Sequence, residues 1–206
     1  FYAPAGTYSL DFFPPTGYLG TSTPITVTTA GVSGENVALS AGTVVHGQVV
    51  SDANSLPVSG VNVVAYDAGP PCCGPGFWGR TDTAGDFQVT VPTGHSYVFD
   101  FQPPASSSLA PQWYTGSGTG SATQAGALAV SVGTPDLPLN QTRLVGGTVL
   151  SGTLRGATTG NPAVNVYVRA DQTGGGGPPA SQVNSDGGGH WALTVPTDGT
   201  TYTVSF

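Results

Sequence analysis

Apolar and polar residues alternate along most of this chain with a period of two. The alternation is clear in VVHGQVV (44–50), VNVVAYD (61–67), FQVTV (87–91) and YVFDF (97–101). A period of two places successive side chains on opposite faces of a β-strand, so each segment predicts a half-buried strand. No stretch shows the period of an amphipathic helix. The pattern therefore predicts an all-β protein with long loops.

Turn-forming residues separate the expected strands. The hexapeptides TDTAGD (81–86) and SDGGGH (185–190) combine Asp with Gly, and VPTG (91–94) ends a strand with proline. Such residues favour tight turns and interrupt sheet hydrogen bonding. About seven strands at this spacing are typical of a two-sheet sandwich.

The succession of strands and turns is repeated along the chain. Residues 42–69 match residues 147–174 at an offset of 105, and residues 81–101 match residues 184–206. The segment APAGTYSLDF (3–12) repeats the end of the segment 81–101 and of its match 184–206. A glycine precedes a Tyr-containing strand three times, at Gly6, Gly94 and Gly199. Self-similarity of this kind indicates a tandem architecture.

Several segments resemble the carboxypeptidase regulatory-like (transthyretin-like) β-sandwich repeat. They are PVSGVNVVA (57–65), TDTAGDF (81–87), PTGHSY (92–97) and QWY (112–114). In the second copy NPAVNVYV (161–168) keeps the pattern, whereas SDGGGHW (185–191) departs from it. The resemblance implies tandem sandwiches of bacterial surface proteins, a family also found beside catalytic domains of secreted hydrolases. These motifs form turns and core, so they indicate fold better than activity.

The repeat predicts one complete and two partial Ig-like or transthyretin-like sandwich units. We expect residues 1–41 to be the C-terminal part of one unit, 42–142 a complete unit, and 143–206 the N-terminal part of another. Half a sandwich exposes an apolar face and an unpaired strand edge. Either the array continues, or the head and tail of successive chains complement each other's strands and form a filament. Residues 4–12 and 196–206 are expected to form the same strand of a unit. A sandwich completed by simple complementation would therefore contain this strand twice.

Composition and charge narrow the classes of molecule that this protein is expected to bind. The chain has no lysine, four arginines and eleven acidic residues, for a net charge of −7. Without a basic cluster, nucleic acid and anionic membrane surfaces are poor partners. The longest apolar runs are strand-sized, so we expect no membrane insertion. Few charges, two cysteines and no initiating methionine indicate an extracellular, cell-surface protein, processed or excised from a longer chain.

The residues that carry chemistry do not form a catalytic motif. No nucleophile elbow or HExxH helix accompanies the three histidines, and the aspartates stand mostly in turns. Asp82, Asp86 and Asp186 lack the spacing of an EF-hand calcium loop, so hydrogen-bonded turns explain them better. We therefore expect no enzyme, no metal site and no cofactor.

Aromatic residues offer candidate contacts for a ligand or another subunit. Phe77 and Trp78 lie near the cysteines, and Trp113 and Tyr114 lie in a long loop. Either pair could stack on a carbohydrate, contact a neighbouring subunit or cover the end of its own sandwich. Loops of this composition need an apolar anchor, which favours the last two roles. Trp191 occupies the position of Phe87 in the repeat and is expected in the core.

Two kinds of covalent modification can be considered. Adjacent α-carbons such as those of Cys72 and Cys73 lie ~3.8 Å apart, below the roughly 4.4–6.8 Å of ordinary disulfides. A strained vicinal disulfide, interchain disulfides and free thiols stay open, with the vicinal ring first because there is no third cysteine. Asn140 begins the single Asn-Gln-Thr glycosylation sequon.

These features predict a protein whose function is structural. We expect a subunit or segment of an extracellular filament or stalk, with other copies of itself as partners. The alternatives are a carbohydrate-binding or adhesive module, or an accessory domain of a secreted hydrolase.

Overall fold

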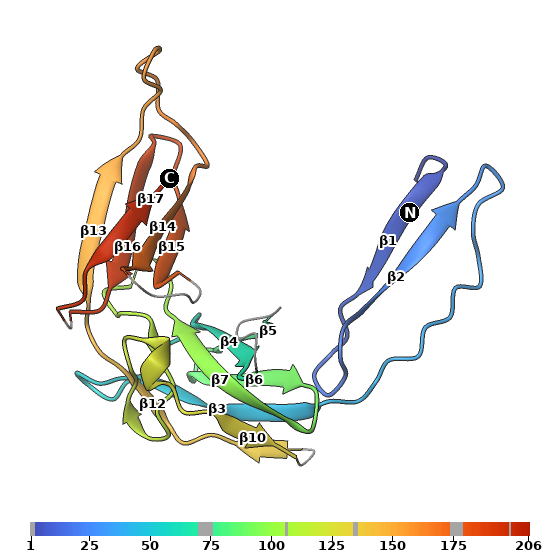
Figure 1. Cartoon of the computed structure of the whole chain (residues 1–206), viewed down its shortest axis with the longest axis horizontal. Helices are drawn as coiled ribbons and strands as arrows, with labels where there is room; N and C mark the ends of the chain where they lie inside the picture. Colours follow the sequence, from blue (N-terminus) through green and yellow to red (C-terminus); the bar gives the residue numbers. More distant parts are fainter. Residues whose placement is uncertain (1–2, 70–75, 106, 134–135, 174–178, 198) are drawn as a thin grey trace.

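The protein forms three bodies along the chain: a hairpin, a central sandwich and a smaller C-terminal unit (Figure 1). The structure is a computed structural model and describes residues 3–69, 76–105, 107–133, 136–173, 179–197 and 199–206. Within these ranges almost all regular structure is β-strand, with one short 3₁₀ turn at Gln124–Gly126. The prediction of an all-β protein with sandwich units is confirmed.

The N-terminal hairpin consists of β1 (Gly6–Phe12) and β2 (Thr21–Val27). The two strands are antiparallel and pair along their full length, from Gly6 opposite Val27 to Phe12 opposite Thr21. The hairpin extends away from the central sandwich, and the N- and C-terminal ends of the chain lie on separate arms (Figure 1).

The first sheet of the central unit is built around β3 (Thr43–Ser51). One edge of β3 pairs antiparallel with β6 (Asp86–Val91). Its other edge pairs parallel with β11 (Asp136–Pro138) and then with β12 (Thr142–Leu144), which in turn pairs with β9 (Gly118–Thr119). Because β12 belongs to this sheet, the strands of the central unit continue to Leu144, two residues past the expected boundary.

The second sheet of the central unit is built around β7 (His95–Gln102). Its strand order is β10 (Val130–Val132), β7, β4 (Asn62–Asp67) and β5 (Phe77–Arg80). The two-residue strand β8 (Gln112–Trp113) also pairs with β7.

Alternating residues of the two sheets form the central core. Odd-numbered residues of β7 face β3 and β6, and the resulting cluster includes Tyr97, Phe99, Phe101, Val45 and Leu144. Phe87 and Phe101 meet edge to face, with ring centroids 5.6 Å apart. Apolar burial of this kind is the main stabilising term of the unit.

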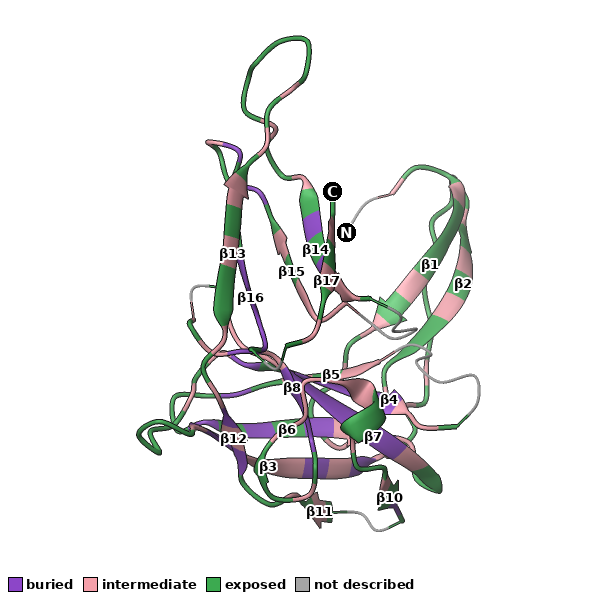
Figure 2. Ribbon diagram, turned by 60° about the vertical axis from the view of Figure 1, so that its left-hand side comes forward, coloured by how far each residue is buried: buried purple, intermediate pink, exposed green. Residues whose placement is uncertain are grey.

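The C-terminal unit repeats five strands of the central one. β13 (Thr148–Thr153) pairs with β16 (His190–Val195), and β14 (Tyr167–Gln172) lies between β15 (Ser181–Asn184) and β17 (Tyr202–Ser205). Its buried cluster is small, namely Val168, Ala170, Leu193 and Val195. Figure 2 shows purple, buried positions filling the central strands and far fewer of them in this unit.

The strand register of the central unit is reproduced in the C-terminal unit. Gly47 lies opposite Phe87 in β3–β6, and Gly152 lies opposite Trp191 in β13–β16. At both places the ring across the ladder crowds a side chain, since a Cβ on Gly47 would lie 3.1 Å from Phe87 and one on Gly152 would lie 2.9 Å from Trp191. The same spatial demand therefore explains why the sequence repeats a glycine here.

Candidate functional site: open sheet edges at both ends

The first open edge belongs to β13. Its counterpart β3 is covered on that side by β11 and β12, whereas β13 pairs only with β16 within the described part of the chain. Thr43 is fully buried in β3, but the equivalent Thr148 is exposed. Unpaired backbone N–H and C=O groups along an edge can pair with a further strand.

The second open edge belongs to β17. Its counterpart β7 lies between β4 and β10, whereas β17 pairs only with β14 among the described strands. Phe101 is 0% exposed in the central unit, and Phe206, at the equivalent position, is 68% exposed. The C-terminal unit thus lacks a cover over positions that its own repeat makes core.

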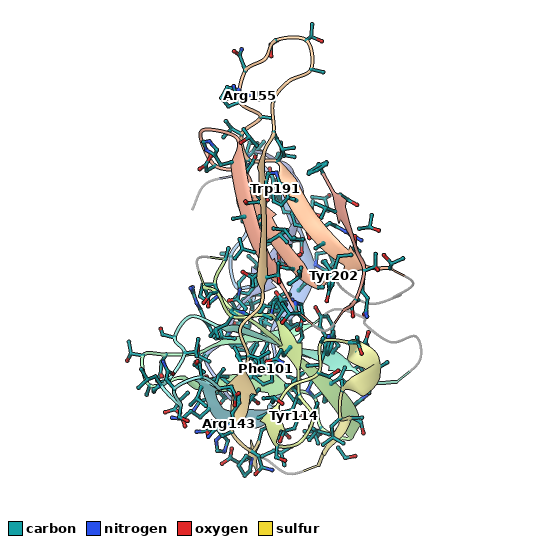
Figure 3. All side chains as sticks on the ribbon, turned by 90° about the vertical axis from the view of Figure 1, so that its left-hand side faces the viewer. Phe101, Tyr114, Arg143, Arg155, Trp191 and Tyr202 are labelled. Carbon is teal, nitrogen blue, oxygen red and sulfur yellow. The ribbon has the colours of Figure 1, made fainter. Side chains whose placement is uncertain are left out.

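Trp191 shows the effect of this missing cover. It occupies the place of Phe87 as the sequence predicts, yet it is only partly buried. Its ring packs against Phe206, with centroids 6.1 Å apart. Figure 3 places Trp191 and Tyr202 in the C-terminal unit, and Phe101 and Tyr114 in the central one. Trp191 therefore packs on the core of its unit as predicted but is buried only in part, because the unit is open.

The N-terminal hairpin reproduces the pairing that β17 lacks. Tyr8 lies opposite Ile25 in β1–β2, as Tyr97 lies opposite Val130 in β7–β10. The Tyr8 hydroxyl donates to the carbonyl of Pro4 (2.9 Å), and the Tyr97 hydroxyl donates to that of Pro92 (3.1 Å). By register and by side-chain contact, β1 corresponds to β7, and β2 corresponds to β10.

The hairpin has one apolar and one polar face. Alternation places Tyr8, Leu10, Phe12, Ile25 and Val27 on the same face. Tyr8 is 39% exposed, and the other four are only half-buried, because no second sheet packs on them within the described residues. Larger apolar patches of this type mark interaction surfaces.

The polar face of the hairpin is a small hydrogen-bonded group. Ser9 contacts Asp11 (2.9 Å) and Ser22 (2.6 Å) through its hydroxyl. Hydrogen bonds from the Ser22 and Ser9 hydroxyls lower the pKa of Asp11, because they stabilise the carboxylate. Asp11 therefore presents a negative charge on the outer face.

The segment after the hairpin corresponds to the strands that cover β3. At an offset of 105, residues 27–42 align without a gap with residues 132–147. This alignment places residues 37–39 at the position of β12. In this chain residues 31–40 form no strand. Residues 6–40 thus hold counterparts of β7, β10 and the strands beside β3.

The hairpin and the central unit meet at a defined junction. The Gly42 amide donates to the Gly17 carbonyl (3.0 Å), and the Leu19 amide donates to the Ser40 carbonyl (2.9 Å). The Gly17 amide also donates to Thr90 Oγ1 on β6 (3.0 Å).

The same junction connects the central and C-terminal units. The Gly147 amide donates to the Ser108 carbonyl, and the Ala110 amide donates to the Val145 carbonyl, both at 2.9 Å. Thr194, the counterpart of Thr90, donates its hydroxyl to the Ser107 carbonyl (3.0 Å). The two backbone hydrogen bonds therefore recur between successive units, whereas the threonine accepts at the first junction and donates at the second.

Two of the four candidate aromatic contacts are buried. Trp113 is 7% and Tyr114 is 4% exposed. Trp113 packs on Tyr66 with ring centroids 5.9 Å apart, while the Tyr114 hydroxyl donates to the Gly116 carbonyl (2.9 Å). Both rings pack on their own sandwich, one on each side of the second sheet.

The other two aromatic residues differ in exposure. Phe77 packs edge to face on Tyr97 at 5.9 Å, whereas Trp78 is 61% exposed. Trp78 borders a hollow of about 410 Å³ together with Phe13 and Tyr18 from the base of the hairpin. Sequence reasoning missed Phe13 and Tyr18, since only the junction brings them beside β5.

The remaining candidate sites are the two cysteines and the glycosylation sequon. Cys72 and Cys73 lie outside the described residues, so their state stays a prediction. Asn140 is exposed, but its side-chain amide donates to the Gly116 carbonyl (2.8 Å), and Thr142 of the sequon is buried.

The turn aspartates bind backbone. Asp82 Oδ1 accepts from the amides of Ala84 and Asp86, and Asp186 Oδ1 accepts from those of Gly188 and His190. These amides, that of His190 foremost, lower the pKa of Asp186. Within the described ranges no three His, Cys, Asp or Glu residues gather as metal ligands, and no helix is long and apolar enough to cross a membrane.

A buried carboxyl group lies on the outer face of the second sheet. Asp100 on β7 is opposite Trp113 and Val64 and is 3% exposed. Burial raises its pKa to about 7, although the Gln102 amide, 2.7 Å away, opposes the shift. The alternating pattern alone does not reveal this residue, because β8, which lies opposite it, comes from a later segment of the chain.

Comparisons with known proteins give remote similarities. No protein-family model matches the chain, and no curated protein matches it. Among solved structures it is similar to the Bacillus anthracis TIE protein (TM-score 0.35, 15% identity), covering 99% of this chain and 37% of that one. It is also similar to a streptococcal ancillary pilin (TM-score 0.34, 11% identity, 100% and 72%). A third is the shaft pilin SpaA of Lactobacillus rhamnosus GG (TM-score 0.30, 14% identity, 79% and 85%).

These scores do not establish a shared family or function. This chain spans little more than a third of the TIE protein chain. The resemblance to carboxypeptidase regulatory-like repeats stays a prediction.

Proposed function

We propose that this chain is a structural subunit of an extracellular filament or stalk, assembled head to tail with other copies of itself. The observation that carries the proposal is the match between its two ends. The C-terminal unit leaves open the edges that β10, β11 and β12 cover in the central unit. The N-terminal residues contain a strand pair in the register of β7–β10.

Assembly would complete one sandwich per contact. The hairpin and residues 28–40 of one copy would cover the C-terminal unit of the next and bury Trp191. Because head binds tail, the contact is heterologous and need not close into a ring. The recurring junction supports extension, since each new sandwich would join its neighbour as the existing ones do.

Electron microscopy of the purified chain tests this proposal. We expect filaments from the parent chain and none from Ile25→Asp, which places a charge on the apolar face of the hairpin. Thr26→Asp, on the opposite face of β2, is the matched control and should still assemble. Monodisperse particles from the parent chain under all conditions would contradict the proposal.

A second candidate function is carbohydrate binding at the hollow beside Trp78. Exposed aromatic rings of Trp78, Tyr18 and Phe13 line it together with the polar side chains of Gln88 and Thr90. Aromatic faces and hydrogen-bonding groups together suit a sugar ring. Polysaccharide binding that Trp78→Ala removes would favour this function, and Leu56→Ala, an exposed apolar residue elsewhere, is the control.

A further inference from the structure

The two ends contain one strand more than a complete sandwich needs. β1 and β17 both correspond to β7: Tyr8 to Phe12 and Tyr202 to Phe206 each align with Tyr97 to Phe101. In a shared sandwich only one of them can lie between β14 and β2. Resting on the proposed function, we propose that β1 of one copy displaces β17 of another and pairs with β14.

Strand length is the first argument. β1 and β2 pair over seven residues each, whereas β17 has four residues paired with β14. Release of β17 therefore breaks the shorter ladder. Phe206 is already mostly exposed, so its release costs little apolar burial. Tyr202 and Val204 of β17 do pack on the C-terminal core, and Tyr8 and Leu10 of β1 would take their places.

Chain continuity is the second argument. After β7, residues 107–110 form the junction with the C-terminal unit through Ser107 and Ser108. β1 leads in the same way into residues 13–19, which form the junction with the central unit through Gly17. With β1 beside β14, each shared sandwich keeps this connection to the next unit.

Charge complementarity is the third argument. In the central unit Val64 lies opposite Asp100, and the equivalent pair in the C-terminal unit is Arg169 opposite Ser205. If β1 replaces β17 in register, Asp11 takes the place of Ser205. Arg169 already pairs with Asp171 on its own strand (2.6 Å), but β17 places only a serine across the ladder from it. The incoming strand would add a carboxylate at that cross-strand position.

Disulfide locks test which strand leaves. The background is Cys72→Ser with Cys73→Ser, which removes the native thiols. Asp171→Cys with Thr203→Cys links β17 to β14, and Thr7→Cys with Thr26→Cys links β1 to β2. Each pair lies directly opposite across its ladder, at a separation suited to a disulfide.

Sedimentation and electron microscopy before and after reduction give the result. We expect the β14–β17 lock to reduce filament yield at least tenfold until dithiothreitol is added, and the β1–β2 lock to assemble like the background. The reverse result, or assembly of both oxidised variants, would overturn the displacement of β17 while leaving head-to-tail assembly intact. A background chain that never assembles would instead refute the proposed function itself.

Charge reversal gives an independent readout. Arg169→Asp should slow assembly, and the added change Asp11→Arg should restore it. Restoration is not expected if β17 stays in place, because Asp11 then remains on the outer face of its own hairpin. Slow assembly of the double variant would therefore contradict the pairing of β1 with β14.

Discussion

Asp100 allows a quantitative test of the central sandwich. Its carboxyl group is buried beneath the loop that carries Trp113, and burial raises its pKa from 3.8 to about 7. Because the folded pKa lies above the unfolded one, the folded state holds the proton more tightly. The stabilisation is fully present below about pH 4 and is lost as the pH rises through about 7.

The magnitude follows from the size of the shift. One pKa unit corresponds to about 1.36 kcal/mol, so the loss between pH 4 and pH 8 is about 4 kcal/mol. Asp100→Asn removes the titrating group and keeps its size. The variant should therefore gain about 4 kcal/mol relative to the parent between these two pH values.

Urea unfolding followed by tryptophan fluorescence is the assay, because Trp113 lies opposite Asp100 on β8. Both chains should contain Ile25→Asp so that assembly does not contribute to stability. Other titrating groups are common to both chains and cancel in the difference. Parallel stability profiles for the two chains, within about 1 kcal/mol, would refute the buried neutral carboxyl group.

Substitutions at three further positions test the packing of the repeat. Thr81→Val should destabilise the central unit by about 1–3 kcal/mol in urea unfolding, because its hydroxyl accepts from the Val61 amide (2.8 Å) and donates to the Val58 carbonyl (2.7 Å). Thr81→Ser should be nearly neutral, and equal losses from both would contradict this role. Val45→Ala should cost about 2–3 kcal/mol, whereas the equivalent Leu150→Ala should cost less in the unassembled chain, since Leu150 is only half-buried. Calorimetry of filaments should show that assembly makes the Leu150 change costly, and an unchanged cost would count against completion of the sandwich.

Much of the fold could be predicted from local pattern. Period-two alternation placed strands within the observed β3, β4, β6 and β7, because a strand with one buried face requires that alternation. The repeat likewise predicted that the strands of residues 42–69 recur in residues 147–174, and the structure places Gly152 opposite Trp191 as it places Gly47 opposite Phe87.

The candidate site could be predicted only in part. The sequence indicated that both ends were incomplete units and that one strand was redundant. It did not indicate that Trp113 and Tyr114 are interior residues, because their burial depends on a loop folding back over β7. Nor could it bring Phe13 and Tyr18 beside Trp78, which requires the junction between hairpin and sandwich.

What the sequence by itself determined is the all-β repeat and the spacing of its strands and turns, since these depend on alternation, turn residues and glycine spacing within short segments. The tertiary structure decided which faces lack a cover and how units join. Exposure of Phe206 and burial of Phe101 come from the same sequence position in the repeat. The difference lies in the strands packed around them, and long-range neighbours of that kind are not encoded in any local pattern.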